Sequence, residues 1–271
     1  MKTPMIERYA AFQRLHQSGC FVIPNPWDVG SARLLQGLGF QALATTSSGF
    51  AWSRGKPDYG VTMPEALGYF RDIVDHVELP VSADFEGCFA DDPAGVQRNV
   101  KAALETGLCG VSIEDSIQNG ATPLYDFKLA VERVRAARRA VDEHGKGVVL
   151  TARFEGFLVG VASLDEAVKR LVAYAEAGAD CLYAPGIRTE EQIRAIVRAV
   201  APKAVNVLCG ADFTTVPKLA EMGVRRISVG GALARSAWTG FMKAAREIAA
   251  SGTFGGFAGI IPNADMNKLM Q

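Results

Sequence analysis

The chain has 271 residues, of which 49% are hydrophobic and 21% are charged, and its 29 Lys and Arg balance its 29 Asp and Glu. These values are ordinary for a globular protein that buries a large core, and they exclude disordered, collagen-like and disulfide-scaffold classes. A net charge of zero predicts that the chain binds neither nucleic acid nor a membrane surface. The sequence contains no run of about 18 apolar residues, so we expect no membrane span. We therefore expect small molecules and copies of the chain itself as partners.

The first residues predict an amphipathic helix over 3–18, without the apolar core and cleavage site of a secretory signal. The five cysteines are scattered and include no CxxC pair, which is typical of reduced thiols rather than of disulfides or a zinc site. Both features predict a cytoplasmic protein.

Beyond this helix, short β-rich runs alternate with longer helical patterns. Most of the runs are almost continuously apolar, which is typical of parallel strands buried on both faces. The predicted strands are Phe21–Pro24, Ala42–Thr46, Val81–Phe85, Gly110–Glu114, Val148–Arg153, Asp180–Tyr183, Ala204–Leu208 and Arg226–Val229. The predicted helices are Ser31–Leu38, Pro64–Val77, Pro93–Glu105, Phe127–Glu143, Leu164–Ala177, Glu190–Val200, Val216–Met222 and Ala232–Ala250.

About eight βα units without a long linker predict a single α/β domain over 1–271 with the (β/α)8 barrel fold. An open doubly wound sheet is the alternative, although no GxGxxG follows a strand to support dinucleotide binding. The tail over 251–271 is Gly-rich and then polar. It is either a loosely ordered surface segment or an arm that packs on a neighbouring subunit.

In a barrel of this kind, the active site lies at the carboxyl ends of the strands and on the loops that follow them. His16, His76 and His144 all fall in predicted helices or at their ends, which argues against His-based acid/base chemistry and a His-liganded metal. The polar side chains at the strand ends are Asp28, Ser47, Ser48, Asp58, Asp84, Glu86, Glu114, Asp115, Arg153, Glu155 and Asn206.

The strand ends thus form a carboxylate-rich mouth with one arginine. Oxygen ligands without His or Cys suit Mg²⁺ or Mn²⁺. Residues two apart on a strand face the same way, so Ser82 and Asp84 share one side, and Glu86 joins them if the strand continues. Glu114, at the end of the next strand, is expected nearby. The alternative role of each carboxylate is a salt bridge or a loop cap.

Two features of this mouth suit an anion. The guanidinium of Arg153 can hold a carboxylate or phosphonate with two hydrogen bonds, the alternative being an ion pair with Glu155 or Glu114. The run Ser47-Ser48-Gly49 offers hydroxyl and backbone N–H groups, the alternative being an ordinary polar turn.

Six motifs between Phe21 and Gly231 resemble, in the same order, the isocitrate lyase/phosphoenolpyruvate mutase superfamily. They are Pro26-Trp-Asp-Val-Gly-Ser-Ala-Arg33, Thr45-Thr-Ser-Ser-Gly49, Gly55-Lys-Pro-Asp58, Val81-Ser-Ala-Asp-Phe-Glu86, Val111-Ser-Ile-Glu-Asp115 and Thr151-Ala-Arg153. The resemblance implies a barrel that is usually tetrameric, with its last helix packed on a partner subunit. It also implies Mg²⁺, an α-keto or 2-hydroxy acid substrate, and cleavage or rearrangement of a C–C or P–C bond through an enolate-like species.

The resemblance also implies roles for individual residues. Asp84 and Glu114 correspond to carboxylates that hold the metal, largely through water, and Asp58 to an acidic residue near the metal. Arg153 corresponds to the arginine that grips the substrate. The predicted substrate-binding set is Thr46, Ser47, Ser48, Gly49, Asp84, Arg153 and Asn206, and the predicted catalytic set is Arg153, Asp58 and Glu114.

The chain departs from the family pattern at two places. Ser82 replaces the first Asp of the usual Asp-x-Asp, and we hypothesise that Glu86 compensates, giving a predicted metal set of Asp84, Glu86 and Glu114. The segment over 115–125 lacks the Lys-Lys/Arg-Cys-Gly-His motif of the lyases, so a standard isocitrate or 2-methylisocitrate lyase is not expected. Asn119 is the nearest counterpart of the asparagine used by mutases and phosphonopyruvate hydrolases.

The sequence therefore predicts Mg²⁺-dependent cleavage of a C–C bond in a small α-keto acid, such as decarboxylation of oxaloacetate through a pyruvate enolate. The alternatives are P–C bond chemistry of the phosphonopyruvate hydrolase or mutase type, and a barrel that binds keto acids with weak turnover. A sugar-phosphate aldolase would need a Schiff-base lysine at a strand end, and none is predicted there. A homodimer or homotetramer is the expected assembly.

Overall fold

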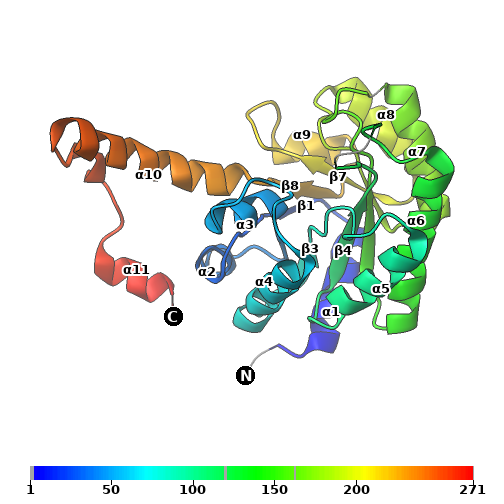
Figure 1. Ribbon diagram of the computed structural model, residues 1–271, viewed down its shortest axis with the longest axis horizontal. Helices are drawn as coiled ribbons and strands as arrows, with labels where there is room; N and C mark the ends of the chain where they lie inside the picture. The colour runs from blue at the N-terminus through cyan, green and yellow to red at the C-terminus, as the bar shows by residue number, and fades with distance from the viewer. Residues whose placement is uncertain (1–2, 119–120, 162, 271) are drawn as a thin grey trace.

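Eight parallel strands form one sheet in the order β1-β8-β7-β6-β5-β4-β3-β2 in the computed structural model, which describes residues 3–118, 121–161 and 163–270. Ala44 N donates to Pro24 O (3.1 Å) and Asn25 Nδ2 donates to Thr45 O (2.9 Å), so the two outermost strands also meet. The sheet is therefore nearly closed into the predicted barrel, with helices around it (Figure 1). The strands are β1 Phe21–Ile23, β2 Leu43–Ala44, β3 Val81–Ala83, β4 Gly110–Glu114, β5 Val149–Arg153, β6 Cys181–Tyr183, β7 Ala204–Leu208 and β8 Arg226–Ser228.

The predicted helices are present in the predicted order, with shifts of one or two residues at most ends, and three described helical segments that were not predicted join them, at Ser47–Ser53, Gly255–Phe257 and Asn263–Leu269. The described helices are α1 Met5–Gln17, α2 Val29–Gly37, α3 Ser47–Ser53, α4 Met63–His76, α5 Pro93–Leu104, α6 Phe127–His144, α7 Leu164–Glu176, α8 Glu190–Val200, α9 Val216–Glu221, α10 Ala232–Ser251 and α11 Asn263–Leu269, with a 3₁₀ turn η1 at Gly255–Phe257. No described helix combines the length and the apolar character that crossing a bilayer requires.

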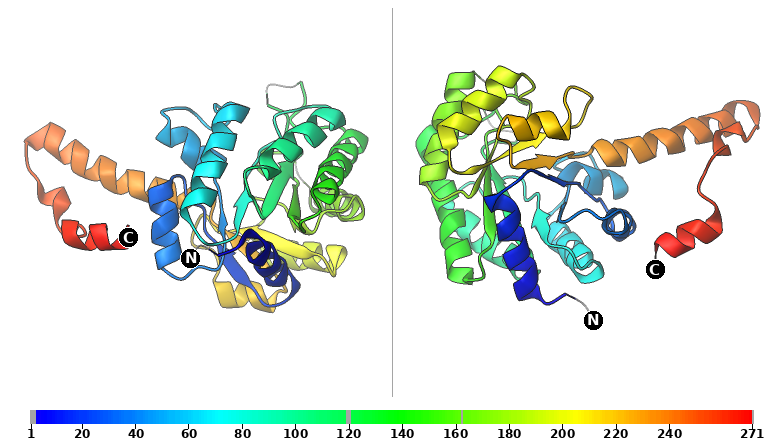
Figure 2. Two further views of the ribbon diagram at one scale, coloured as in Figure 1. Left: turned by 90° about the horizontal axis from the view of Figure 1, so that it is seen from below. Right: turned by 180° about the vertical axis from the view of Figure 1, so that it is seen from behind.

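The amino-terminal end of the barrel is covered by α1 (Figure 2, left). Phe12 packs so closely against the start of β4 that a Cβ on Gly110 would lie 2.7 Å from its ring. Glycine is therefore required at this contact, and the cover leaves the opposite end of the barrel, at the carboxyl ends of the strands, as the open one.

The interior of the barrel is unusually polar. Barrels of this fold are usually filled by layers of bulky branched side chains. Here the buried strand residues include Ser82, Ser112, Thr151, Asn206 and Ser228. Because several of these side chains are small, they leave room for a cavity along the axis.

The turn after β3 has an uncommon backbone. Glu86, Cys88 and Phe89 have φ angles of 50°, 60° and 52°, in the left-handed region that non-glycine residues rarely adopt. The buried guanidinium of Arg133, from α6, donates to the carbonyl oxygens of Gly87 (2.9 Å), Ala90 and Asp91 (2.9 Å). These hydrogen bonds come from outside the turn and hold its strained conformation.

The carboxyl-terminal segment forms an arm outside the barrel. Helix α10 projects away from the strands, and the chain then folds back (Figures 1 and 2). Only Ala234 of α10 is buried, and Arg33 of α2 donates to Met270 O (2.7 Å) beyond α11. This hydrogen bond ties the end of the arm to α2, and packing of the arm on a neighbouring subunit stays a prediction.

Candidate active site

A cavity of about 180 Å³ opens at the carboxyl ends of the strands and reaches into the barrel. Asp58, Asp84 and Arg153 line it together with the predicted Thr46, Ser47, Ser48 and Asn206. These side chains were chosen because they follow predicted strands, and they lie around one cavity. The reason is that parallel strands bring their carboxyl ends to the same side of the sheet.

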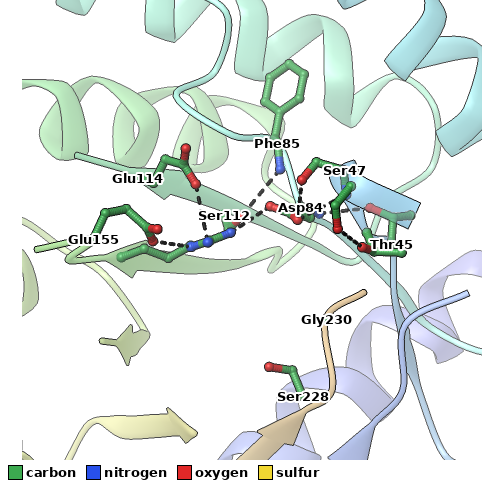
Figure 3. Close-up of polar contacts among 12 residues, drawn as sticks. Thr45, Ser47, Asp84, Phe85, Ser112, Glu114, Glu155, Ser228 and Gly230 are labelled. Carbon is green, nitrogen blue, oxygen red and sulfur yellow. Dashed lines mark hydrogen bonds and ion pairs between the residues drawn. The ribbon is translucent and has the colours of Figure 1, made fainter. Parts of the chain in front are cut away.

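Asp84 lies at the centre of the polar contacts (Figure 3). Its Oδ2 accepts hydrogen bonds from the backbone N and the Oγ of Ser47, both at 3.1 Å, and its Oδ1 pairs with Arg153 Nη1 at 2.7 Å. The backbone N of Asp84 donates to Thr45 Oγ1 (2.9 Å). The side chain of Thr45 thus accepts the hydrogen bond that a backbone carbonyl of β2 would accept if the strands continued. Both β2 and β3 end earlier than predicted, at Ala44 and Ala83.

Arg153 makes ion pairs with three carboxylates. Besides Asp84, its Nε contacts Glu155 Oε1 at 2.8 Å and its Nη2 contacts Glu114 Oε2 at 3.4 Å. Burial alone lowers the pKa of Arg153, but Glu155, Glu114 and Asp84 outweigh it and hold the pKa well above its usual range. The sequence analysis gave an ion pair with Glu155 or Glu114 as the alternative role of Arg153, and both ion pairs are present. Binding of an anion by Arg153 stays a prediction.

More carboxyl groups crowd this site than Arg153 alone can pair with. Burial, with Asp84 and Glu114 nearby, raises the pKa of Glu86 to about 8. Burial also raises the pKa of Glu114, and burial together with Asp84 raises that of Asp58. Raised carboxyl pKa values mark a site where negative charges are crowded together.

Glu86 does not occupy the predicted position. Strand β3 ends at Ala83, and the left-handed backbone at Glu86 ends the alternation that placed its side chain beside Asp84. Glu86 and Glu114 are both buried, and neither lines the cavity. The hypothesis that Glu86 continues the strand face is therefore wrong.

The predicted metal set stays a prediction. Within 3–118, 121–161 and 163–270, no three His, Cys, Asp or Glu side chains are placed to hold one ion together. Asp84 and Glu114 were expected to hold the metal largely through water, which does not require such a direct set of ligands. The crowded carboxyls around Asp84 nevertheless fit a hydrated divalent cation, because Mg²⁺ usually keeps several of its waters.

The first turn of α3 carries the predicted anion-binding run. Ser47-Ser48-Gly49 was expected in a loop or polar turn, but it begins a helix because Thr46 caps it, its Oγ1 accepting from Gly49 N (3.3 Å). The N–H of Ser47 is bonded to Asp84, so two of the three amide groups already have partners. Gly49 is buried behind the turn, where a Cβ would lie 2.6 Å from Thr46 Cγ2.

A second buried network supports the end of β5. Asp115 Oδ1 accepts from Glu155 N (2.9 Å), and its Oδ2 accepts from Arg170 Nη1 (3.1 Å) and Tyr174 Oη (2.5 Å). Burial raises the pKa of Asp115, and these hydrogen bonds oppose the rise. Asp115 is thus a positioning residue that holds the backbone of Glu155, and through it Arg153.

Several residues were assigned no role from the sequence. Tyr59, Tyr183 and Arg226 line the cavity, and Asn25 Oδ1 accepts from Val229 N (2.9 Å) and Gly230 N (2.8 Å) at its edge. Ser228 and Gly230 lie across the site from Asp84 and Glu114 (Figure 3). Among the predicted residues, Asn119 lies outside the described residues.

Comparisons with known proteins place the chain in a family. A family model described as phosphoenolpyruvate phosphomutase matches residues 12–249. A solved structure of a protein from Burkholderia cenocepacia J2315, provisionally named a lyase or mutase, is 44% identical with a TM-score of 0.95, and the match covers 97% of this chain and 96% of that one.

Two further relatives have named activities. The 2-methylisocitrate lyase of Escherichia coli K12 is 31% identical over 213 residues, which covers 76% of this chain and 70% of the lyase. Oxaloacetate acetylhydrolase, solved with its product oxalate, is 25% identical with a TM-score of 0.87, and the match covers 99% of this chain and 95% of that one.

Proposed function

Because this chain belongs to the phosphoenolpyruvate phosphomutase family, an enzyme family of lyase and mutase chemistry, we propose that it cleaves a C–C bond in a small α-keto acid. The proposed reaction leaves a pyruvate-like enolate, as in decarboxylation of oxaloacetate. The observation that carries the proposal is the cluster of Arg153, Asp84 and Ser47 in a cavity sized for a small acid.

In the proposed mechanism, the chain's own residues bind and orient the substrate. Ser47, Ser48 and Arg153 face the cavity and hold the keto-carboxylate end by hydrogen bonds and charge. When the C3–C4 bond of oxaloacetate breaks, CO₂ leaves and the electron pair moves through C3 to the keto oxygen. The enolate then takes a proton at C3, and Asp58, at the rim with a raised pKa, is the proposed donor.

A divalent cation fits the same site. Asp84 would hold it, with Asp58 and Glu114 acting through water, and its charge would offset the crowded carboxylates. Such an ion supplies a Lewis acid for the developing negative charge on the keto oxygen.

The test is release of pyruvate from oxaloacetate, with the spontaneous rate subtracted. We expect release by the wild-type protein with Mg²⁺, loss of release with EDTA, and a fall of at least about a hundredfold in Arg153→Ala. Arg135→Ala, which removes an exposed arginine of α6 paired with Glu132, is the matched control and should keep full activity. No release by the wild-type protein would contradict the proposal, and binding of oxalate without turnover would favour a keto-acid-binding protein.

We also propose that the arm packs on a second copy of the chain, as a homodimer or a larger assembly. A groove of about 890 Å³ lies between Trp52 of α3 and α10, and large apolar side chains along the arm are exposed. Exposed apolar surface of this extent is typical of an interface. Light scattering of the wild-type protein and of Phe241→Glu tests this, and a monomer in both would contradict it.

A further inference from the structure

Tyr183 ends β6 inside the barrel, and the proposed mechanism gives it no role. Its side chain is only 7% exposed and lines the same cavity as Asp84 and Arg153. Arg153, which pairs with Tyr183 in the sheet register, places its guanidinium carbon 5.1 Å from the centre of the Tyr183 ring. The ring is therefore packed beside a group that the mechanism assigns to the substrate.

A chain of hydrogen bonds leads to the hydroxyl of Tyr183 from the floor of the cavity, where Arg226 begins β8. Arg226 Nε donates to Asn206 Oδ1 (3.0 Å), and Asn206 Nδ2 donates to Ser228 Oγ (2.9 Å). The hydroxyl of Ser228 is in turn hydrogen-bonded to that of Tyr183. The first two bonds have a fixed direction, because an amide oxygen only accepts and an amide nitrogen only donates.

The last bond of the chain takes the same direction. Because Ser228 Oγ already accepts from Asn206, its own hydrogen fills the bond to Tyr183 Oη, in the head-to-tail order that strengthens such chains. The phenol of Tyr183 therefore accepts from Ser228 and keeps its hydrogen for another partner. Burial raises the pKa of Tyr183 more than Arg153 and Ser228 lower it, so the hydroxyl stays protonated at neutral pH.

The chain starts from a buried positive charge. Arg226 is 5% exposed, and its Nη1 lies 3.3 Å from His16 Nε2. Burial, and then the charge of Arg226, lower the pKa of His16 to about 3, so this ring is neutral. Arg226 thus contacts uncharged groups, the amide of Asn206 and the ring of His16. A cation at the start of the chain polarises each hydrogen bond toward Tyr183, which makes the phenol a stronger donor.

We propose that Tyr183 is a catalytic residue whose hydroxyl donates a hydrogen bond to the keto oxygen of the substrate, where the enolate charge develops. Arg226, Asn206 and Ser228 are then positioning residues that aim and polarise this hydroxyl. The inference rests on the proposed function and adds a residue that the sequence motifs do not contain. As CO₂ leaves, the electron pair reaches the keto oxygen, and the phenol keeps its proton. A donor that is already oriented needs no reorganisation at that moment.

The kinetic test is Tyr183→Phe, which removes the hydroxyl and keeps the ring beside Arg153. With Mg²⁺ and oxaloacetate, we expect kcat to fall about a hundredfold and KM to change by less than about threefold, because the hydrogen bond is strongest in the transition state. Tyr9→Phe is the matched control: it removes the hydroxyl of another buried tyrosine, which contacts His144 (3.4 Å) near α1, and should keep full activity.

Calorimetry separates this role from structural support. Oxalate carries a charged oxygen where the enolate oxygen would lie, whereas pyruvate has a neutral keto oxygen there. We expect wild type with Mg²⁺ to bind oxalate more tightly than pyruvate. In Tyr183→Phe, oxalate should bind at least about tenfold more weakly and pyruvate within about threefold of wild type, because a hydrogen bond to a charged acceptor is the stronger one. Ser228→Ala interrupts the chain one step earlier and should weaken oxalate by a smaller factor, with pyruvate unchanged.

Each outcome decides the question. An unchanged kcat in Tyr183→Phe overturns the proposal, and so does an equal loss of oxalate and pyruvate binding, which would indicate a structural role. A wild-type protein that does not prefer oxalate overturns it even if Tyr183→Phe does not fold, and so does a full preference in Ser228→Ala. If wild type releases no pyruvate from oxaloacetate but its preference for oxalate depends on Tyr183, the proposed function fails and the role of Tyr183 as a donor stands.

Discussion

The mouth and the floor of the barrel cavity each hold a buried arginine, and they treat its charge in opposite ways. At the mouth, Arg153 contacts Asp84, Glu114 and Glu155, and carboxyls remain in excess. At the floor, Arg226 contacts an amide and a neutral imidazole. The same residue type thus pairs with carboxylates in one region and with uncharged groups in the other.

The largest effect is expected from removing the guanidinium at the mouth. Arg153→Ala leaves three carboxylates without their partner, of which Glu114 and Glu155 are buried, and breaking a buried ion pair in this way costs about 3–5 kcal/mol. The loss should be smaller at about pH 5 than at about pH 8, because the carboxyls can then take up protons. Urea unfolding at both pH values measures it. An equal loss at both would show that the ion pairs do not set the stability of the mouth.

The next effect concerns the turn that carries Glu86. Arg133→Met should reduce the free energy of unfolding by about 2–3 kcal/mol, because the carbonyl oxygens of Gly87, Ala90 and Asp91 lose a charged donor. Arg135→Met, on the exposed side of the same helix, is the control and should change stability little. If both variants unfold at the same urea concentration, Arg133 does not hold the turn.

A smaller effect, dependent on pH, is expected at Glu86 itself. Its folded pKa of about 8 lies above the ordinary value of 4.5, so the native state keeps a proton that the unfolded chain has released. The stability of the wild-type protein therefore falls as pH rises from about 4.5 to about 8. Glu86→Gln should be more stable than wild type at about pH 8, by about 1–2 kcal/mol, and similar near pH 4.5. Thermal unfolding in EDTA measures this, and a pH-independent change would contradict the assignment.

The smallest effect is expected at the floor. Arg226→Gln should change the stability of the ligand-free protein by no more than about 1 kcal/mol, because it removes an unneutralised charge as well as hydrogen bonds. The change should be the same at about pH 5 and about pH 8, since the pKa of His16 is about 3. A change that grew with pH would mean that a carboxylate faces Arg226, and the contrast with the mouth would fail.

The barrel and most of the mouth were predictable because they follow from periodicity. Apolar runs spaced by helical segments identify parallel strands, and their carboxyl ends collect the polar residues; Gly110–Glu114 and Ala204–Leu208 were predicted without error. The same rule missed Arg226, which begins its strand and faces the cavity from below. The position of Arg226, a charged residue in an otherwise uncharged and buried strand, was the signal in the sequence that could have identified it.

Other errors arose where local backbone geometry overrides alternation. Glu86 was placed by counting two residues from Asp84, but the chain turns after Ala83 because Arg133 holds it there. Helix α3 was missed because Ser47, Ser48 and Gly49 have low helix propensity, and the cap at Thr46 compensates. The contact of Arg133 with the turn joins residues 42 to 46 positions apart, so reading short stretches of the sequence cannot reveal it.

The arginine that holds the turn lies 42 to 46 residues further along the chain than the carbonyl groups it contacts. A growing polypeptide therefore exposes the left-handed segment before α6 exists to hold it. Because domains acquire long-range contacts late, the backbone around Glu86 should become protected from hydrogen exchange only when α5 and α6 have docked on each other. The order of synthesis thus places completion of the mouth after the formation of the first half of the barrel.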